Sequence, residues 1–100
     1  MKTITFYSYK GGTGRSLALA NAARYLARLE YRVVAVDFDL EAPGLHYKFS
    51  PSLEGTPLPV TAGIVDYLHS FIVDGKLPKT LKDYVIDVAV PGIDKPLVHL

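Results

Sequence analysis

The order of apolar and polar positions predicts a β-strand, a helix and a second β-strand within the first 37 residues. Residues 3–8 are β-branched and aromatic, which is typical of a strand that is buried on both faces. Residues 16–30 contain neither glycine nor proline, and their apolar positions recur with the spacing of an amphipathic helix. Residues 32–37 form a second apolar run that ends in an acid. This order predicts a βαβ unit with two parallel strands and a right-handed crossover.

The rest of the chain predicts shorter elements around a long connection. Residues 41–62 hold four prolines and two glycines without a periodic element, which predicts a long loop that is either functional or poorly ordered. Residues 63–73 predict a short helix that ends at Asp74-Gly75. Three short elements follow, namely a helical turn, a strand and the start of a further strand, at 81–84, 85–90 and 97–100.

The connection between the first predicted strand and the helix has the composition of a phosphate-binding loop. It reads Tyr9-Lys10-Gly11-Gly12-Thr13-Gly14-Arg15-Ser16. Glycines let the backbone turn tightly and bring consecutive N–H groups against phosphate oxygens, and the helix N-terminus adds partial positive charge. Lys10 and Arg15 can neutralise phosphate charge, and the Ser16 hydroxyl stands where a magnesium ligand is expected. The structural alternative is a glycine-rich turn with a serine cap.

Two acids follow the second predicted strand, at the edge where open α/β sheets bind their ligands. Asp37 and Asp39 are two residues apart, so they point the same way if the strand continues that far. We expect them beside the glycine loop, where a carboxylate can order metal-bound water or position an attacking water. The structural alternative is an acid that ends a strand and is followed by a solvated loop.

These motifs resemble the deviant Walker A motif and the Asp-x-Asp pair of the ParA/MinD-type ATPases. The resemblance covers residues 1–45, and the form Lys-Gly-Gly-x-Gly-Arg is similar to a variant branch of these ATPases. It implies an α/β fold, a P-loop NTPase-like (Rossmannoid) parallel sheet flanked by helices. It also implies a nucleotide-switched homodimer that binds ATP with Mg²⁺ and hydrolyses the ATP.

The resemblance further implies a role for each residue of the two motifs. Lys10 would reach the nucleotide of the partner protomer and act in catalysis, and Asp39 would position the attacking water or act as the base. Ser16 and Asp37 would serve the magnesium ion. The phosphates would be bound by the loop as a whole, which comprises Lys10, Gly11, Gly12, Thr13, Gly14, Arg15 and Ser16.

Two positions depart from the general Walker A pattern and open alternatives. Tyr9 replaces its first glycine, and Arg15 replaces its lysine with a larger, planar group that makes bidentate contacts. These departures favour a second hypothesis, a nucleotide-binding sensor or interaction module with little or no hydrolysis. A third hypothesis is that residues 1–100 are the N-terminal portion of a longer P-loop ATPase domain, incomplete as an enzyme, because no clear Walker B strand follows residue 50.

Composition and charge narrow the class of protein. The chain is 49% apolar with a net charge of +1, which is globular and gives no sequence-wide basic field for nucleic acid. The absence of cysteine excludes disulfides, cysteine-based zinc sites and cysteine nucleophiles. No apolar run approaches about 18 residues and no signal-peptide pattern is present, so we expect a soluble cytoplasmic protein without a membrane span.

Two groups of side chains invite a functional interpretation and have a simpler one. Arg24, Arg28 and Arg32 could meet a nucleic-acid backbone, but three arginines on a nearly neutral chain are typical of a solvated helix face. A protein or DNA partner therefore stays open. The three histidines are far apart and share no metal-ligand spacing, so none is expected to bind metal, namely His46, His69 and His99.

Overall fold

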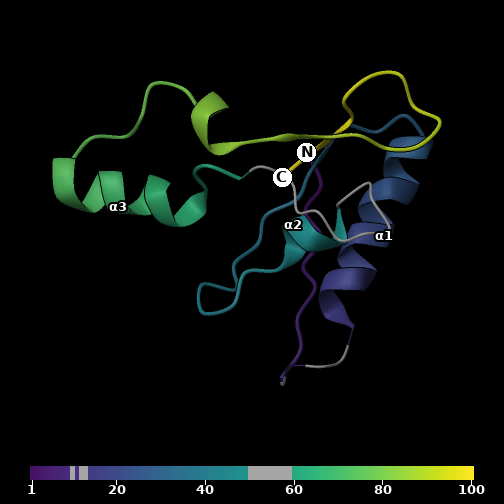
Figure 1. Cartoon of the computed structure of the whole chain (residues 1–100), viewed down its shortest axis with the longest axis horizontal. Helices are drawn as coiled ribbons and strands as arrows, with labels where there is room; N and C mark the ends of the chain where they lie inside the picture. The colour runs from purple at the N-terminus through teal and green to yellow at the C-terminus, as the bar shows by residue number, and fades with distance from the viewer. Residues whose placement is uncertain (10, 12–13, 50–59) are drawn as a thin grey trace.

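The fold combines helices with a small mixed β-sheet (Figure 1). The computed structural model describes residues 1–9, 11, 14–49 and 60–100. The elements in chain order are α1 (Arg15–Arg28), β1 (Val33–Val34), α2 (Leu45–Lys48), α3 (Ile64–Asp74), the 3₁₀ helix η1 (Lys82–Tyr84), β2 (Asp87–Val88) and β3 (Val98–His99). The expected α/β class is confirmed. The sheet is mixed rather than wholly parallel, since β3 pairs in parallel with β1 and antiparallel with β2.

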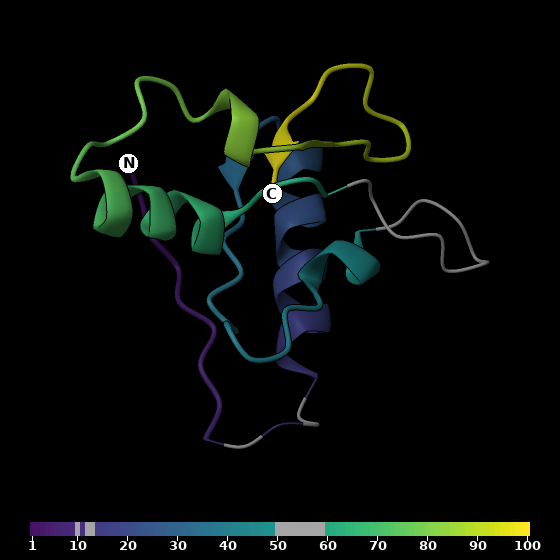
Figure 2. The ribbon, with the colours of Figure 1, turned by 60° about the vertical axis from the view of Figure 1, so that its left-hand side comes forward.

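Helix α1 packs against the sheet and α2 through a face of small residues (Figure 2). Ala20, Ala23 and Ala27 are at most 3% exposed and recur at the spacing of one helix face. Alanine side chains let the helix axis lie close to its neighbours. The other buried core residues are Ala35, Leu45, Phe49, Val88, Val90, Leu97 and Val98.

Strand β3 is the centre of the sheet because both of its edges are bonded. On one side, the Val33 N–H donates to the Leu97 carbonyl and the Ala35 N–H donates to the His99 carbonyl, both at 2.7 Å. On the other side, Ile86 and Leu100 exchange two N–H to carbonyl bonds of 2.9 Å. The predicted strands at 85–90 and 97–100 are therefore present, although the assigned strands are shorter.

The predicted strand at 3–8, paired in parallel with 32–37, is wrong. The structure describes all of residues 3–8 and assigns no strand to them, and the Ile4 and Tyr7 residues are 64% and 80% exposed. β-Branched composition favours a strand only when a neighbouring strand takes its backbone hydrogen bonds. The parallel partner of β1 is β3, and no described strand pairs with residues 3–8.

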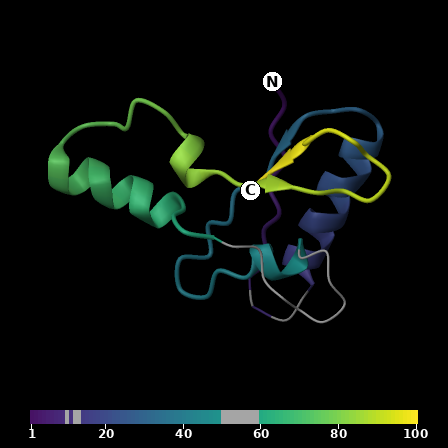
Figure 3. The same cartoon turned by 45° about the horizontal axis from the view of Figure 1, so that its top comes forward.

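The helix predicted over 63–73 is confirmed as α3, which lies apart from α1 (Figures 1 and 3). Its start is capped by Asp66, whose Oδ2 accepts the Gly63 N–H at 2.8 Å. Gly75 ends it in the left-handed region with φ 64°. The predicted turn at 81–84 is confirmed as η1, and the Tyr84 ring packs edge-on against an α3 tyrosine.

The predicted loop over 41–62 contains a helix that the periodicity does not reveal. Helix α2 spans four residues, which is too short for a repeating apolar pattern. It forms because Leu45 and Phe49 are buried at 2% and 1% exposure against the rest of the core. Residues 50–59 lie outside the described part of the chain, so the remainder of the loop prediction stays a prediction.

Helix α1 ends in a left-handed residue that is not glycine. Glu30 has φ 65°, its N–H donates to the Ala27 carbonyl at 2.9 Å, and the Tyr31 N–H donates to the Leu26 carbonyl at 3.1 Å. This pair of bonds is the Schellman motif, which strongly favours glycine at the left-handed position. Glu30 therefore holds a conformation that is unfavourable for an L side chain.

We expect Glu30→Gly to raise the free energy of unfolding by about 1 kcal/mol, because glycine adopts the left-handed region without steric cost. Urea denaturation followed by circular dichroism measures the change. The matched control is Glu30→Ala, which removes the same carboxylate but keeps a Cβ, and should give no gain. An equal gain in both variants would show that the charge of Glu30, and not its backbone, is unfavourable.

Candidate phosphate-binding site

The N-terminus of α1 is open toward the glycine loop. Gly14 is the residue before the helix, in the left-handed region with φ 77°, and its carbonyl accepts the Ala18 N–H at 2.9 Å. Among the described residues, no side chain caps this end and no acid lies in the first turn. The N–H groups of the first turn therefore have no acceptor from a cap, and the helix dipole adds positive character there.

The glycine positions also leave room for a ligand. A Cβ built at Gly11 or Gly14 would meet no described atom within 4 Å. Ser16 lies inside the helix, so the alternative of a turn with a serine cap is wrong. An anion such as a phosphate group fits this arrangement, because the helix end is uncapped, the space around the two glycines is open and an arginine follows them.

Three residues of the predicted loop lie outside the described residues. They are Lys10, Gly12 and Thr13. The roles that the sequence predicts for them, including the action of Lys10 on the partner protomer, stay predictions.

Arg15 joins three segments of the chain at the mouth of the site. Its Nη1 donates to the Ser8 Oγ at 3.0 Å, and its Nη2 lies 3.6 Å from the Asp39 Oδ2. The Arg15 and Asp39 side chains are 32% and 39% exposed, so water screens their attraction. The structure thus brings Asp39 to Arg15, the first residue of α1, without the parallel strand pair from which that position was expected.

Asp37 is held in a different way and organises the segment after β1. Its Oδ1 accepts the Asp39 N–H at 3.1 Å, and its Oδ2 accepts the N–H groups of Gly44 and Leu45 at 3.0 and 2.9 Å. The carboxylate thereby caps the start of α2 from a position eight residues upstream. Capping rules examine the residue next to the helix, so the sequence gives no signal for this contact.

These bonds limit how Asp37 can serve a magnesium ion. A carboxylate has about four acceptor sites, and backbone N–H groups occupy three of them here. The remaining capacity fits a hydrogen bond from metal-bound water better than direct ligation. Within the described part of the chain, no cluster of three or more His, Cys, Asp or Glu side chains could hold a metal.

Arg24 has a structural role in this fold. Its Nη2 donates to the Lys48 carbonyl at 2.6 Å, and its guanidinium lies 5.3 Å from the centroid of the Phe49 ring. A cation near the end of a helix also interacts favourably with the helix dipole. Arg24 therefore ties α1 to the end of α2, which is a structural role for one of the three arginines named in the sequence.

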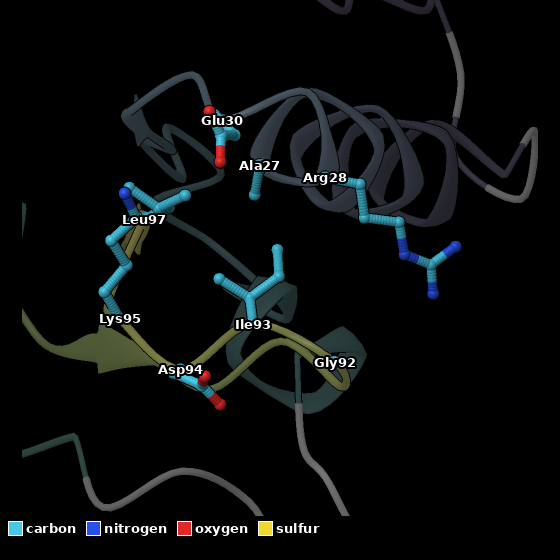
Figure 4. Close-up of a pocket in the computed structure, with 8 residues that line it drawn as sticks. All are labelled: Ala27, Arg28, Glu30, Gly92, Ile93, Asp94, Lys95 and Leu97. Atoms are coloured by element: carbon cyan, nitrogen blue, oxygen red, sulfur yellow. The ribbon is translucent and has the colours of Figure 1, made fainter.

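Two hollows lie near opposite ends of α1. One of about 420 Å³ is lined by residues at the glycine loop, namely Thr5, Phe6, Tyr7, Ser8, Gly14, Arg15 and Ala18. The other, of about 440 Å³, lies at the C-terminal end of α1 against residues 92–97 (Figure 4). None of the predicted site residues lines the second hollow. The first hollow therefore borders the candidate site at Gly14 and Arg15, and the second does not.

Comparison with known proteins identifies the family. Residues 4–89 match the model of the CobQ/CobB/MinD/ParA nucleotide binding domain. The chain belongs to this family, which confirms the resemblance to ParA/MinD-type ATPases. It therefore carries a nucleotide-binding domain with a P-loop. No solved structure shows a significant match.

The chain matches only a small part of the length of its curated relatives. The chain is 37% identical over 59 residues to the "Putative replication protein A" of Sinorhizobium fredii, which covers 57% of this chain and 14% of that protein. It is 51% identical over 39 residues to the "Putative septum site-determining protein MinD" of Oltmannsiellopsis viridis, which covers 39% of this chain and 12% of that protein. In the described residues, none of the helices combines the length and apolar composition needed to cross a bilayer.

We expect Asp37→Ala to lower the free energy of unfolding by about 2 kcal/mol, because three backbone N–H groups lose a charged acceptor and α2 loses its cap. The matched variant Asp39→Ala should cost less than about 1 kcal/mol, since Asp39 makes exposed contacts. Urea denaturation of both variants measures the difference. Equal costs for the two acids would contradict the capping role of Asp37.

Proposed function

We propose that this chain is the N-terminal portion of a magnesium-dependent ATPase domain of the ParA/MinD type, which acts as a nucleotide-switched dimer. The observation that carries the proposal is the uncapped N-terminus of α1, with a left-handed Gly14 before it and Arg15 at its mouth, in a chain of this nucleotide-binding family. A homodimer is the assembly that the resemblance implies, and we propose it on that basis, together with a cytoplasmic location.

The proposed nucleotide site uses the backbone and side chains of one loop. The first-turn N–H groups of α1 and those of the glycine loop would bind the phosphate oxygens, and Arg15 would add a positive charge. Lys10 would reach the nucleotide of the partner protomer. The full set of proposed nucleotide-binding residues is Lys10, Gly11, Gly12, Thr13, Gly14, Arg15 and Ser16.

The metal ion and the attacking water would be held by the last residue of that loop and by the two acids that follow β1. A bound Mg²⁺ supplies positive charge to the phosphate oxygens. We propose the Ser16 hydroxyl as its ligand and Asp37 as the acceptor for metal-bound water. Asp39 would position the attacking water, since its Oδ1 is fixed by the Ala42 N–H at 3.1 Å and its Oδ2 faces Arg15.

A second candidate function is a nucleotide sensor with little or no hydrolysis. The observation that favours it is the contact between Arg15 and Asp39, because a carboxylate oxygen that faces a cation is less available to orient a water molecule. Release of phosphate from bound ATP in a single turnover distinguishes the two functions. An ATPase releases phosphate with Mg²⁺ present, and a sensor retains intact ATP.

Replacing Arg15 by alanine should weaken the binding of Mg-ATP by roughly 10- to 150-fold, because a charged contact to phosphate contributes about 1.5–3 kcal/mol. Isothermal titration calorimetry on the unmodified chain and the variant measures the change in Kd. Arg28→Ala is the matched control, because it removes an exposed arginine at the far end of the same helix.

The control should bind Mg-ATP as the unmodified chain does. Unchanged affinity in Arg15→Ala would contradict the placement of phosphate at the start of α1. The proposed function itself would fail if the unmodified chain did not bind Mg-ATP.

A further inference from the structure

The two ends of the Arg15 guanidinium have different partners, and this difference suggests a function for the contact. Nη1 donates to a neutral hydroxyl, that of Ser8, at a hydrogen-bonding distance of 3.0 Å. Nη2 faces the charged carboxylate of Asp39 at 3.6 Å, which is longer than the 2.7–2.9 Å typical of a charge-assisted hydrogen bond. The Asp39 contact is therefore the looser of the two and the easier to exchange.

Phosphate and Asp39 compete for the same nitrogen. Phosphate bound at the start of α1 would lie next to Arg15, the first residue of the helix, and it carries more negative charge than one carboxylate. Nη2 carries two N–H groups, but a phosphate oxygen brought to it would repel the Asp39 carboxylate, because two anions would then lie beside the same nitrogen. The inference rests on the proposed function, because it takes phosphate as the ligand at this end of α1.

We propose that Arg15 is an exchange contact: without nucleotide its Nη2 holds Asp39, and phosphate binding takes Nη2 over and releases the Asp39 carboxylate. Ser8 holds Nη1, so the guanidinium stays at the mouth of the site during the exchange. Asp39 becomes available to a water only when phosphate is bound. The contact thereby couples the binding of phosphate to the release of the Asp39 carboxylate.

The chemistry of arginine suits this exchange better than that of lysine. The guanidinium presents several N–H donors in a planar fork, so one side can keep a partner while the other side changes. A lysine ammonium is a point charge that moves as a whole. The arginine that departs from the general Walker A pattern is therefore the feature that makes a held and an exchanging contact possible at once.

The test measures the affinity for AMP-PNP, an ATP analogue that is not hydrolysed, in the presence of Mg²⁺. Asp39→Asn should tighten binding by about two- to fivefold, the range expected when an exposed ion pair no longer competes. Asn keeps an oxygen for the Ala42 N–H, so the loop stays in place. In an Arg15→Gln background the same Asp39→Asn change should leave the affinity unchanged.

Glu41→Gln is the matched control for simple charge removal. It neutralises an exposed acid two residues from Asp39 and should not alter the affinity. Equal tightening by Glu41→Gln, or by Asp39→Asn both with and without the Arg15→Gln change, would show long-range repulsion and overturn the exchange. Unchanged or weaker binding by Asp39→Asn with Arg15 present would overturn it as well.

A second measurement reads the ligand-free contact directly. A double-mutant cycle of Arg15→Gln and Asp39→Asn, followed by thermal unfolding, should show coupling without nucleotide and lose it at saturating AMP-PNP. Coupling that persists at saturation would overturn the exchange while leaving the proposed function intact. A failure of the unmodified chain to bind AMP-PNP would instead overturn the proposed function, and the exchange with it.

Discussion

The carboxylate of Asp37 is the interaction on which the arrangement of the site depends. Both of its oxygens accept backbone N–H groups, one from Asp39 and two from the start of α2. The chain is thereby folded back immediately after β1, and α2 begins where its buried residues Leu45 and Phe49 meet the core. Arg24 holds the other end of α2 from α1. The short helix is thus fixed at both ends by side chains that are distant in sequence.

This constraint determines what reaches the glycine loop. Because Asp37 is turned toward the N–H groups of α2, the acid that faces Arg15 is Asp39. The two acids of the motif therefore have different roles: Asp37 holds the segment after β1 in place, and Asp39 contacts Arg15. Positive charge at the start of α1 comes from the helix end and from Arg15. The one described carboxylate that pairs with Arg15 is that of Asp39, and it is exposed enough to give way to another anion.

The parts of the fold that follow from local physical chemistry could be predicted from the sequence. The alanines and leucines of α1 repeat at helical spacing, Gly75 stops α3, and the glycines before Arg15 signal an open helix start. The Asp39 carboxylate does lie beside Arg15, although the parallel strand pair from which that position was expected is absent.

The parts that depend on long-range contacts could not be predicted. The β-branched residues 3–8 match a strand, but the parallel partner of β1 is β3, which lies more than sixty residues further along the chain. Helix α2 is too short to show a period, and its cap lies eight residues upstream. The structural use of Asp37 and Arg24 depends on the same non-local contacts.

The most direct test of the account is a titration of the ¹⁵N-labelled chain with Mg²⁺ and AMP-PNP, followed by amide chemical shifts. The largest shifts should occur at the amides of Gly14, Arg15 and Ser16, and the Leu29 and Glu30 amides at the other end of α1 should not move. Shifts confined to the hollow at the other end of α1, with none at Gly14–Ser16, would contradict a phosphate site at the start of α1; that hollow is lined by Ala27, Arg28, Glu30, residues 92–95 and Leu97.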